Sequence, residues 1–331
     1  MRSLIVQPYG GLCNRLRAVI SASILADSLG CNFQVDWVPD PLTCGCEARD
    51  LFRHFPGTDA DATCGEFQEV RDEIGLRRLE ATPSSTDIQI RTQRELRPRN
   101  MGSAEFEAEF RRRLRTLLPQ PSILGRVPTV PDGAIGLQIR RGDHWMATRY
   151  APLHLFHRAI EAHSDDAKRP PIYLATDSPR VALSFASRYG PRLLQFEGRR
   201  AERGTAEGVA DALVDLLALA RTSVIFASAH SSFGPMASRW GGAPLQTLSL
   251  AGAPETYAGT ALDRLHLRFL RFDRTSGRFR PRPARRRAGR ILAWMLSPLV
   301  WGILIPRSDR VLGDAYQEGI ESEAVGRSTS R

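Results

Sequence analysis

Lysine is almost absent from this sequence. The 331-residue chain has 46 basic residues and a formal net charge of +10, yet Lys168 is its only lysine. Arginine therefore carries nearly all of the positive charge, and its planar guanidinium binds phosphate and carboxylate groups through two parallel hydrogen bonds. The skew fits a protein that binds anionic ligands, although a compositional bias of the genome would produce the same skew.

Long apolar segments are also lacking. The N-terminus enters an apolar strand directly, so we expect no signal peptide, which needs a charged region followed by an apolar one. The apolar run Ile291–Pro306 contains Pro298 and is shorter than the ~20 residues that span a bilayer. With 42% hydrophobic and 25% charged residues, the composition is that of an ordinary globular protein.

Metal-ligand patterns are missing as well. Cys44-x-Cys46 is too closely spaced for the usual zinc pair, and no second Cys/His pair stands nearby. The odd number of cysteines favours reduced, buried thiols in a cytosolic protein. These are Cys13, Cys31, Cys44, Cys46 and Cys64.

One short acidic motif resembles a metal-binding sequence. Asp59-Ala60-Asp61 has the D-x-D spacing of some metal-dependent glycosyltransferases, but it follows no predicted strand. We interpret it as a solvated loop, and the sequence predicts no metal site.

What the sequence does contain is an alternation of strands and helices. In the first half we predict a strand at Arg2–Pro8, a helix at Asn14–Leu29, a strand at Asn32–Val38 and, after a weakly patterned region, a helix at Glu105–Leu118. The proline-rich segment Pro119–Gly133 marks a boundary. We therefore expect an N-terminal α/β domain at 1–125, a nucleotide-binding domain at 126–258 and a tail at 259–331.

The second half repeats the alternation more regularly. It predicts strands at Ala134–Ile139, Pro171–Thr176, Leu193–Phe196, Ser223–Ala227 and Leu245–Leu250, and helices at Pro152–Ala162, Pro179–Tyr189, Gly208–Arg221 and Ser232–Trp240. Such a rhythm favours a parallel sheet covered on both faces. Ligands of these sheets bind in the crevice at the carboxyl ends of the strands.

Four polar loops follow predicted strands. Gly10, Gly11, Asn14 and Arg15 stand where the first strand turns into the first helix, although a tight turn explains the glycines equally well. Arg140, Arg141 and Asp143 follow the strand at Ala134–Ile139. One arginine can reach into the crevice while the other pairs with a carboxylate such as Asp143; a surface ion pair is the alternative.

The other two loops follow the next strands. Asp177 can accept hydrogen bonds from a guanine or a ribose, whereas helix capping accounts for Ser178. Ser231 and Ser232 can cap a helix whose free N–H groups suit a phosphate. Together the four loops indicate an anionic, nucleotide-like ligand.

These motifs, "GGLCNRL", "IRRGD", "YLATDS" and "DLLALARTSVIFASAHSSFG", resemble in that order the metal-independent fucosyltransferase superfamily. The group includes α1,2-, α1,6- and protein O-fucosyltransferases and the rhizobial nodulation enzymes. The resemblance extends from Ser3 to Gly242. It implies an α/β, GT-B-like fold of two Rossmann-like domains with a cleft between them, and GDP-fucose as the donor without a metal cofactor.

The resemblance also implies roles for single residues. Arg140 matches the arginine that contacts the donor diphosphate, Asn14 the asparagine near the sugar and phosphate, and Asp177 the acid that reads guanine. The family's loop around the donor falls on Ser231, Ser232 and Phe233. One departure is Gln138, which replaces a histidine of the family and cannot titrate.

As a mechanism we expect direct displacement at the anomeric carbon, with inversion. Arg140 would stabilise the charge that develops on the departing diphosphate. Asp143 is a candidate base for the acceptor hydroxyl, with His144 beside it. The expected acceptor is an oligosaccharide or a lipid-linked glycan.

The C-terminal tail is strongly basic. Eleven arginines and one acid lie between Arg264 and Arg290, directly before the apolar run Ile291–Pro306. We expect residues 264–306 to contact an anionic membrane surface peripherally, with the chain in the cytoplasm at the inner face of the cytoplasmic membrane. The alternatives are a core helix, an oligomer contact and a nucleic-acid-binding arm. The last is disfavoured because no aromatic-interleaved pattern accompanies the arginines.

Overall fold

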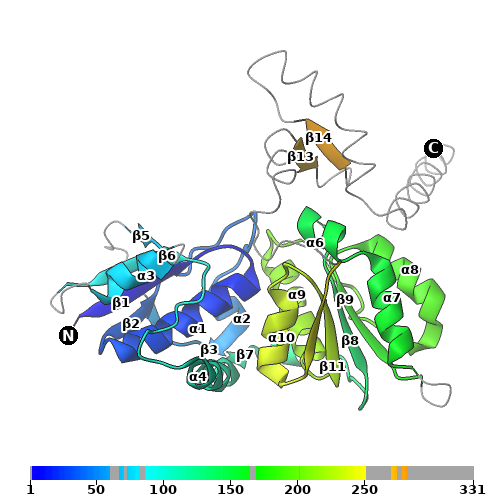
Figure 1. Ribbon diagram of the computed structural model, residues 1–331, viewed down its shortest axis with the longest axis horizontal. Coiled ribbons are helices and arrows are strands. Elements are labelled where there is room, and N and C mark those ends of the chain that lie inside the picture. Colours follow the sequence, from blue (N-terminus) through cyan, green and yellow to red (C-terminus); the bar gives the residue numbers. More distant parts are fainter. Residues whose placement is uncertain are drawn as a thin grey trace. The chain divides into compact units, whose positions relative to one another are not determined.

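The computed structural model describes residues 2–59, 67–70, 73–81, 86–142, 144–164, 169–200, 202–250, 270–273 and 278–281. Within these ranges the chain forms two five-stranded sheets with helices between the strands (Figure 1). All strand pairs in both sheets are parallel. The predicted α/β class is confirmed.

The first sheet is built around its first strand. Its strands run in the order β4-β2-β1-β6-β5. They are β1 (Ser3–Pro8), β2 (Asn32–Val35), β4 (Thr58–Asp59), β5 (Gln68–Glu69) and β6 (Ile88–Thr92). Leu4 and Val6 of β1 are fully buried, and α1 (Leu12–Ser28) packs on β1 and β2. β1 is the central strand of this sheet, with β2 on one side and β6 on the other.

The second sheet has the order β10-β9-β8-β11-β12. Its strands are β8 (Ile135–Ile139), β9 (Ile172–Thr176), β10 (Leu193–Leu194), β11 (Val224–Ser228) and β12 (Leu245–Leu248). Every residue of β8 and β9 is buried, as expected for central parallel strands covered on both faces. The switch point of this sheet lies between β8 and β11.

One face of the second sheet carries a compact apolar core. Leu137 and Ile139 of β8 pack with Phe156 and Phe185 from the helices α7 (Leu153–Ala162) and α8 (Pro179–Tyr189). The remaining helices are α2 (Ala48–Leu51), α3 (Glu73–Glu80), α4 (Ser103–Thr116), α5 (Pro121–Leu124), α6 (Trp145–Tyr150), η1 (Gly190–Arg192), α9 (Ala206–Leu219) and α10 (Phe233–Gly241). Two antiparallel pairs complete the elements: β3 (Phe52–His54) with β7 (Leu118–Pro119), and β13 (Leu270–Asp273) with β14 (Arg278–Pro281).

The chain divides into two compact units, and the division differs from the one expected at residue 125. The first unit contains Met1–Thr129, Phe196–Arg221 and Pro235–Ala243; the second contains Val130–Gln195, Thr222–Gly234 and Pro244–Arg331. Thus α9 and most of α10 belong to the first unit, although in sequence they connect strands of the second sheet. The periodic apolar pattern of the sequence identifies such helices, but it does not show against which unit their apolar faces pack.

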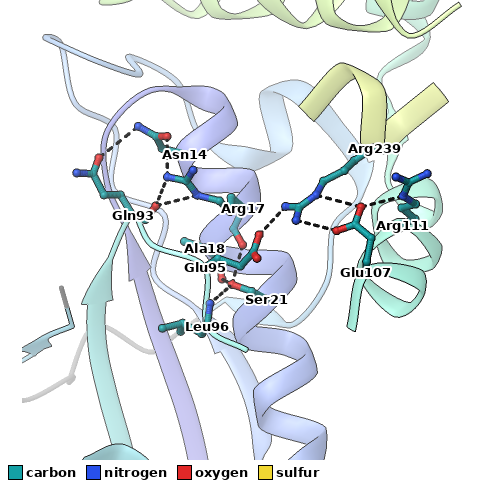
Figure 2. Close-up of polar contacts among 10 residues, drawn as sticks. All are labelled: Asn14, Arg17, Ala18, Ser21, Gln93, Glu95, Leu96, Glu107, Arg111 and Arg239. Carbon is teal, nitrogen blue, oxygen red and sulfur yellow. Dashed lines mark hydrogen bonds and ion pairs between the residues drawn. The ribbon is translucent and has the colours of Figure 1, made fainter. Parts of the chain in front are cut away.

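Ion pairs explain why α10 belongs to the first unit. Nη1 of Arg239 lies 2.5 Å from Glu95, and Nη2 lies 2.8 Å from Glu107 on α4 (Figure 2). The guanidinium also stacks over the ring of Phe110, 4.3 Å from its centroid. Glu107 in turn accepts a hydrogen bond from Nε of Arg111. This partly buried network fixes α10 on α4 and on the loop that follows β6.

Buried carboxylates anchor α9 in the same way. Asp211 pairs with Arg126 and accepts a 2.8 Å hydrogen bond from the backbone N–H of Arg200. Asp215 binds the guanidinium of Arg199. Both aspartates are at least nine-tenths buried, so loss of either arginine would leave a buried carboxylate without its ion-pair partner, which is costly.

The tail is described only at β13 and β14, a hairpin within the arginine-rich stretch that the sequence did not predict. The apolar run Ile291–Pro306 lies outside the described residues, as does most of 264–306. In the part of the chain that the structure describes, no helix is both long and apolar enough to cross a bilayer.

Candidate active site

The polar loops predicted from the sequence follow the central strands of the two sheets. Gly10–Asn14 follows β1, the central strand of the first sheet, and Arg140 follows β8, beside the switch point of the second. At a switch point the loops on either side diverge and leave room for a ligand.

Three strand ends meet at Arg140. Its backbone N–H donates a 3.0 Å hydrogen bond to Oγ of Ser228, the last residue of β11. Its guanidinium forms an ion pair with Asp177, which follows β9. The Arg140 side chain is 11% exposed and that of Asp177 is 19% exposed. The ion pair therefore holds the guanidinium in place beside the strand ends. It can bind an anionic ligand there without a further loss of side-chain freedom.

The structure gives Asp177 a use that the sequence did not predict. Oδ2 pairs with Arg140, and Oδ1 accepts a 2.7 Å hydrogen bond from the backbone N–H of Arg141. The expected carboxylate partner of this arginine pair was Asp143, which lies outside the described residues. Recognition of guanine by Asp177 stays a prediction. What the structure shows is a carboxylate that positions Arg140.

Gly142 is required by this arrangement. A Cβ atom added to it would lie 2.6 Å from Oδ2 of Asp177, closer than nonbonded atoms approach. The glycine of the "RRGD" motif is thus explained by packing: only a residue without a side chain lets Asp177 reach both arginines.

Arg141 and Ser178 serve the local structure. The Arg141 guanidinium is buried and donates 2.8 Å hydrogen bonds to the carbonyl oxygens of Arg140 and Ala151. Ser178 caps α8 by accepting a hydrogen bond from the N–H of Val181, as the alternative reading expected. Direct donor contacts by these two residues stay predictions.

The loop after β11 turns sharply into α10. His230 has a φ of +62°, an unusual backbone conformation for a residue with a side chain. Ser231 accepts a long hydrogen bond of 3.4 Å from the N–H of Phe233, where α10 begins, and Ser232 lies between them. Gly234 packs against β11, since a Cβ there would lie 2.3 Å from Cβ of Ala227. The start of α10 is therefore held close to the sheet.

The Gly10 loop is equally ordered. Gly10 has a φ of +82°, and a Cβ there would lie 2.9 Å from Oε1 of Gln93, in the loop that follows β6. Gly11 is the N-cap of α1, and no acidic residue lies in the first helical turn. The positive end of the helix dipole is thus not offset by a neighbouring carboxylate of that turn.

A polar network fixes the Asn14 side chain (Figure 2). Its Nδ2 donates to Oε1 of Gln93 at 3.2 Å, and its Oδ1 accepts from Nη2 of Arg17 at 3.1 Å. Arg17 also donates to the carbonyl oxygen of Gln93, at 2.7 and 3.2 Å. Burial lowers the pKa of Arg17 from its usual value, and nearby Glu95 opposes that shift. Asn14 is therefore presented in one orientation.

Arg15 is a structural residue of this loop. Its side chain is 1% exposed, with Nε bound to the carbonyl oxygen of Gly10 at 2.9 Å and Nη1 to that of Val38 at 2.7 Å. The guanidinium also lies over the ring of Trp37. Burial lowers the pKa of Arg15, with opposing contributions from Cys44 and Asp40. Its expected donor contact stays a prediction, whereas its support of Gly10 is a feature of the structure.

Sequence reasoning missed Ser228 and Gln93. Ser228 stood at a predicted strand end and could have been found by the same rule that selected Arg140. Gln93 belongs to a region with weak patterning and gave no signal. A further polar group is Gln138 on β8, which is 4% exposed and whose Oε1 has no hydrogen-bond partner. His144, beside the candidate base Asp143, uses Nδ1 to cap α6.

Metal-binding groups were sought throughout the described ranges. There, no three or more His, Cys, Asp or Glu side chains are grouped closely enough to hold a metal ion. Asp59 is the second residue of the short strand β4, while Ala60 and Asp61 lie outside those ranges.

Comparison with known proteins links this fold to one group of structures. No protein-family model and no curated protein sequence matches the chain. Among solved structures, it is similar to NodZ α-1,6-fucosyltransferase soaked with GDP-fucose, with a TM-score of 0.55 and 19% identity over 78% of this chain and 98% of NodZ.

Two further structures extend the similarity. FUT1 from Arabidopsis thaliana in complex with GDP has a TM-score of 0.51 and 14% identity, over 74% of this chain and 69% of FUT1. POFUT1 in complex with GDP has a TM-score of 0.50 and 10% identity, over 75% and 99% of the two chains. At these identities the comparisons establish a shared fold. The GT-B-type fold that the resemblance implied is confirmed.

The contact between Gly142 and Asp177 generates a stability prediction. Gly142→Ala places a methyl group against the carboxylate, and we expect it to cost about 1–3 kcal/mol of unfolding free energy, as overpacking does. In an Asp177→Ala background the same substitution should cost little. Denaturant unfolding of the four proteins measures the coupling. Gly102→Ala is the control, because nothing lies within 4 Å of a Cβ there. Equal penalties in both backgrounds would contradict the assigned contact.

Proposed function

We propose that this chain is a glycosyltransferase that uses a nucleotide-sugar donor, and specifically a fucosyltransferase that moves fucose from GDP-fucose to a hydroxyl of a glycan or glycoconjugate. The observation that carries the proposal is the constellation of Arg140, Asp177 and Ser228 beside the switch point of the second sheet. Support comes from the fold, which is shared with proteins crystallised with GDP-fucose or GDP.

The chemistry asked of these residues is electrostatic. Inverting transfer builds negative charge on the departing diphosphate, and a preoriented guanidinium at Arg140 would stabilise that charge without a metal. Asp177 contributes by holding Arg140 in place. In the second unit, the start of α10 with Ser231–Phe233 would offer backbone N–H groups and a positive dipole end to phosphate oxygens. In the first unit, the start of α1 with Gly10, Gly11 and Asn14 would offer the same kind of groups. Asp143 remains the candidate base.

Two alternatives remain distinct from this proposal. The same fold could use another nucleotide sugar, because Arg140 would contact a diphosphate whichever base and sugar it carries. A non-catalytic protein that binds nucleotides or glycans is the second alternative. The nucleotide preference separates the first alternative from the proposal, and turnover separates the second.

Nucleotide selectivity is the first expected outcome. GDP and GDP-fucose should raise the melting temperature of the protein, whereas UDP should leave it unchanged. A ligand at 100 times its Kd stabilises the folded state by about 2.7 kcal/mol, which is enough for a shift of several degrees. Thermal melts with GDP, UDP, GDP-mannose and GDP-fucose provide the measurement. A larger shift with UDP than with GDP would contradict a guanosine donor.

The second expected outcome concerns the loss of the Arg140 side chain. Arg140→Ala should lower kcat by roughly 100- to 1,000-fold, the cost of removing one preorganised charge-stabilising group. Transfer from labelled GDP-fucose to a panel of oligosaccharide and lipid-linked acceptors measures this. Arg158→Ala removes an exposed arginine of α7 and is the matched control. Near-normal turnover of Arg140→Ala, with Arg158→Ala also normal, would exclude the assigned role.

We also propose that the chain acts in the cytoplasm, peripherally at the inner face of the cytoplasmic membrane, through residues 264–306. The support is the eleven arginines between Arg264 and Arg290, followed by an apolar run too short to span a bilayer. Basic residues near an anionic surface each contribute about 1 kcal/mol of binding free energy.

Vesicle binding of the full chain should therefore depend on both charge and salt. We expect sedimentation with vesicles rich in phosphatidylserine, not with neutral ones. Arg285→Gln, Arg286→Gln and Arg287→Gln together should weaken binding on the order of 100-fold at ~1 kcal/mol per arginine. Arg53→Gln, Arg78→Gln and Arg158→Gln make the same charge change at exposed positions elsewhere. If both triple variants bind alike, the tail is not the contact.

A further inference from the structure

Two buried cysteines lie side by side beneath the Gly10 loop. Sγ of Cys44 is 4.0 Å from Sγ of Cys46, and the residues are 0% and 2% exposed. Both are free thiols. A disulfide needs an S–S distance of about 2.05 Å and Cα atoms within about 6.8 Å. Residues two apart span at most about 7 Å, so the pair can be bridged with a small movement.

The thiol pair is connected to Gly10 through two side chains. Nε1 of Trp37 donates a 2.8 Å hydrogen bond to the carbonyl oxygen of Cys46. The guanidinium of Arg15 lies over the Trp37 ring, 5.1 Å from its centroid, and donates to the carbonyl oxygen of Gly10. A displacement of Cys46 can therefore move Trp37 and, through it, Arg15, whose guanidinium binds Gly10 before the start of α1.

The backbone between the two cysteines is closely packed. The N–H of Gly45 donates a 3.0 Å hydrogen bond to the carbonyl oxygen of Arg203. A Cβ on Gly45 would lie 2.0 Å from the carbonyl oxygen of Gly204, which shows how closely the two chain segments approach. On the other side, Cys44 exchanges two 2.8 Å backbone hydrogen bonds with Asp40. Closing a disulfide must therefore strain or break some of these contacts.

The two thiols differ in reactivity. A hydrogen bond from Cys46 lowers the pKa of Cys44, and the positive charge of Arg15 acts in the same direction, although burial opposes both. The pKa of Cys46 is raised. Cys44 is thus the nucleophile of the pair, because the thiolate is the reactive form of cysteine, and Cys46 is the thiol that would react second.

We propose that Cys44 and Cys46 form a peroxide-sensitive dithiol whose oxidation to a disulfide weakens ligand binding at the Gly10 loop. The ligand-binding part rests on the proposed function. Hydrogen peroxide is the oxidant, since it is small enough to reach thiols that exclude larger disulfide reagents. The Cys44 thiolate attacks one peroxide oxygen, the O–O bond breaks, and hydroxide leaves, giving a sulfenic acid.

The second step closes the ring. Sγ of Cys46 attacks Sγ of Cys44, the S–O bond breaks, and water leaves with the proton of the Cys46 thiol. Overall, two thiols and one peroxide give one disulfide and two waters. The sulfur atoms then move from 4.0 Å to about 2.05 Å apart. Because Gly45 is clamped against Gly204, the displacement is directed towards Trp37 and Arg15, and so to Gly10.

Disulfide formation is tested first, and independently of any ligand. The full chain is treated with stoichiometric hydrogen peroxide, alkylated under denaturing conditions and digested. We expect the peptide containing Cys44 and Cys46 to be lighter by two hydrogens and resistant to alkylation at both positions until dithiothreitol is added. In Cys46→Ser, dimedone added together with the denaturant should trap a sulfenic acid on Cys44. Oxidation confined to other cysteines would overturn the proposal.

Ligand binding is tested second, by calorimetric titration of GDP into the reduced and oxidised chains. Oxidation should weaken binding roughly tenfold, the scale of losing one or two hydrogen bonds. Dithiothreitol should restore affinity. Cys46→Ser should be insensitive to peroxide at this readout, while Cys31→Ser, at a buried cysteine outside the pair, should respond like the parent chain.

The outcomes separate the two proposals. If the reduced chain binds no GDP while the disulfide forms as described, the proposed function fails and the dithiol chemistry stands. If the disulfide forms and GDP affinity is unchanged, the control of ligand binding by the pair is overturned.

Discussion

The carboxylate of Asp177 is the interaction on which the candidate site depends. It binds the guanidinium of Arg140 with one oxygen and the backbone of Arg141 with the other, and so joins the loops that follow β8 and β9. Ser228 adds the end of β11 by accepting from the Arg140 backbone. An arginine at the end of a strand would otherwise sample many rotamers at an entropic cost. Here that cost is met during folding, before any ligand arrives.

The excess of arginine over lysine has a structural side as well. Arg15, Arg17 and Arg141 each donate to two or more acceptors, mostly backbone carbonyl oxygens, from buried or half-buried positions. A guanidinium presents several N–H groups in a fixed fork and is more weakly hydrated than an ammonium, so it suits such positions better than lysine does. Some of the arginines therefore stabilise the loops through buried hydrogen bonds, and only the others can bind a ligand.

The sequence predicted the second sheet well because its strands are short apolar runs buried on both faces. The helix at Pro179–Tyr189 has the predicted bounds, since proline starts it and Gly190 ends it. The region between Pro39 and Gln93 was not resolved from sequence: β6, with only Ile88 and Ile90 apolar in an alternating pattern, and the four-residue α2 carry too little signal.

For the candidate site, the strand-end rule found Arg140 and Asp177 but not their pairing. Which carboxylate meets an arginine depends on how the loops after β8 and β9 approach each other, whereas proximity in the sequence favoured Asp143, three residues after Arg140. The burial of Arg15 could not be predicted either, because Trp37 and Val38, which contact its guanidinium, follow a different strand.

The path of the chain between the two units has a consequence for biosynthesis. The boundary is passed five times, after residues 129, 195, 221, 234 and 243. Proteins are made from the N-terminus, and domains generally fold in that order as they emerge. Here the first unit lacks the ion-paired body of α10 until residue 243 has left the ribosome. The first unit can therefore be completed only after nearly all of the second sheet has been synthesised.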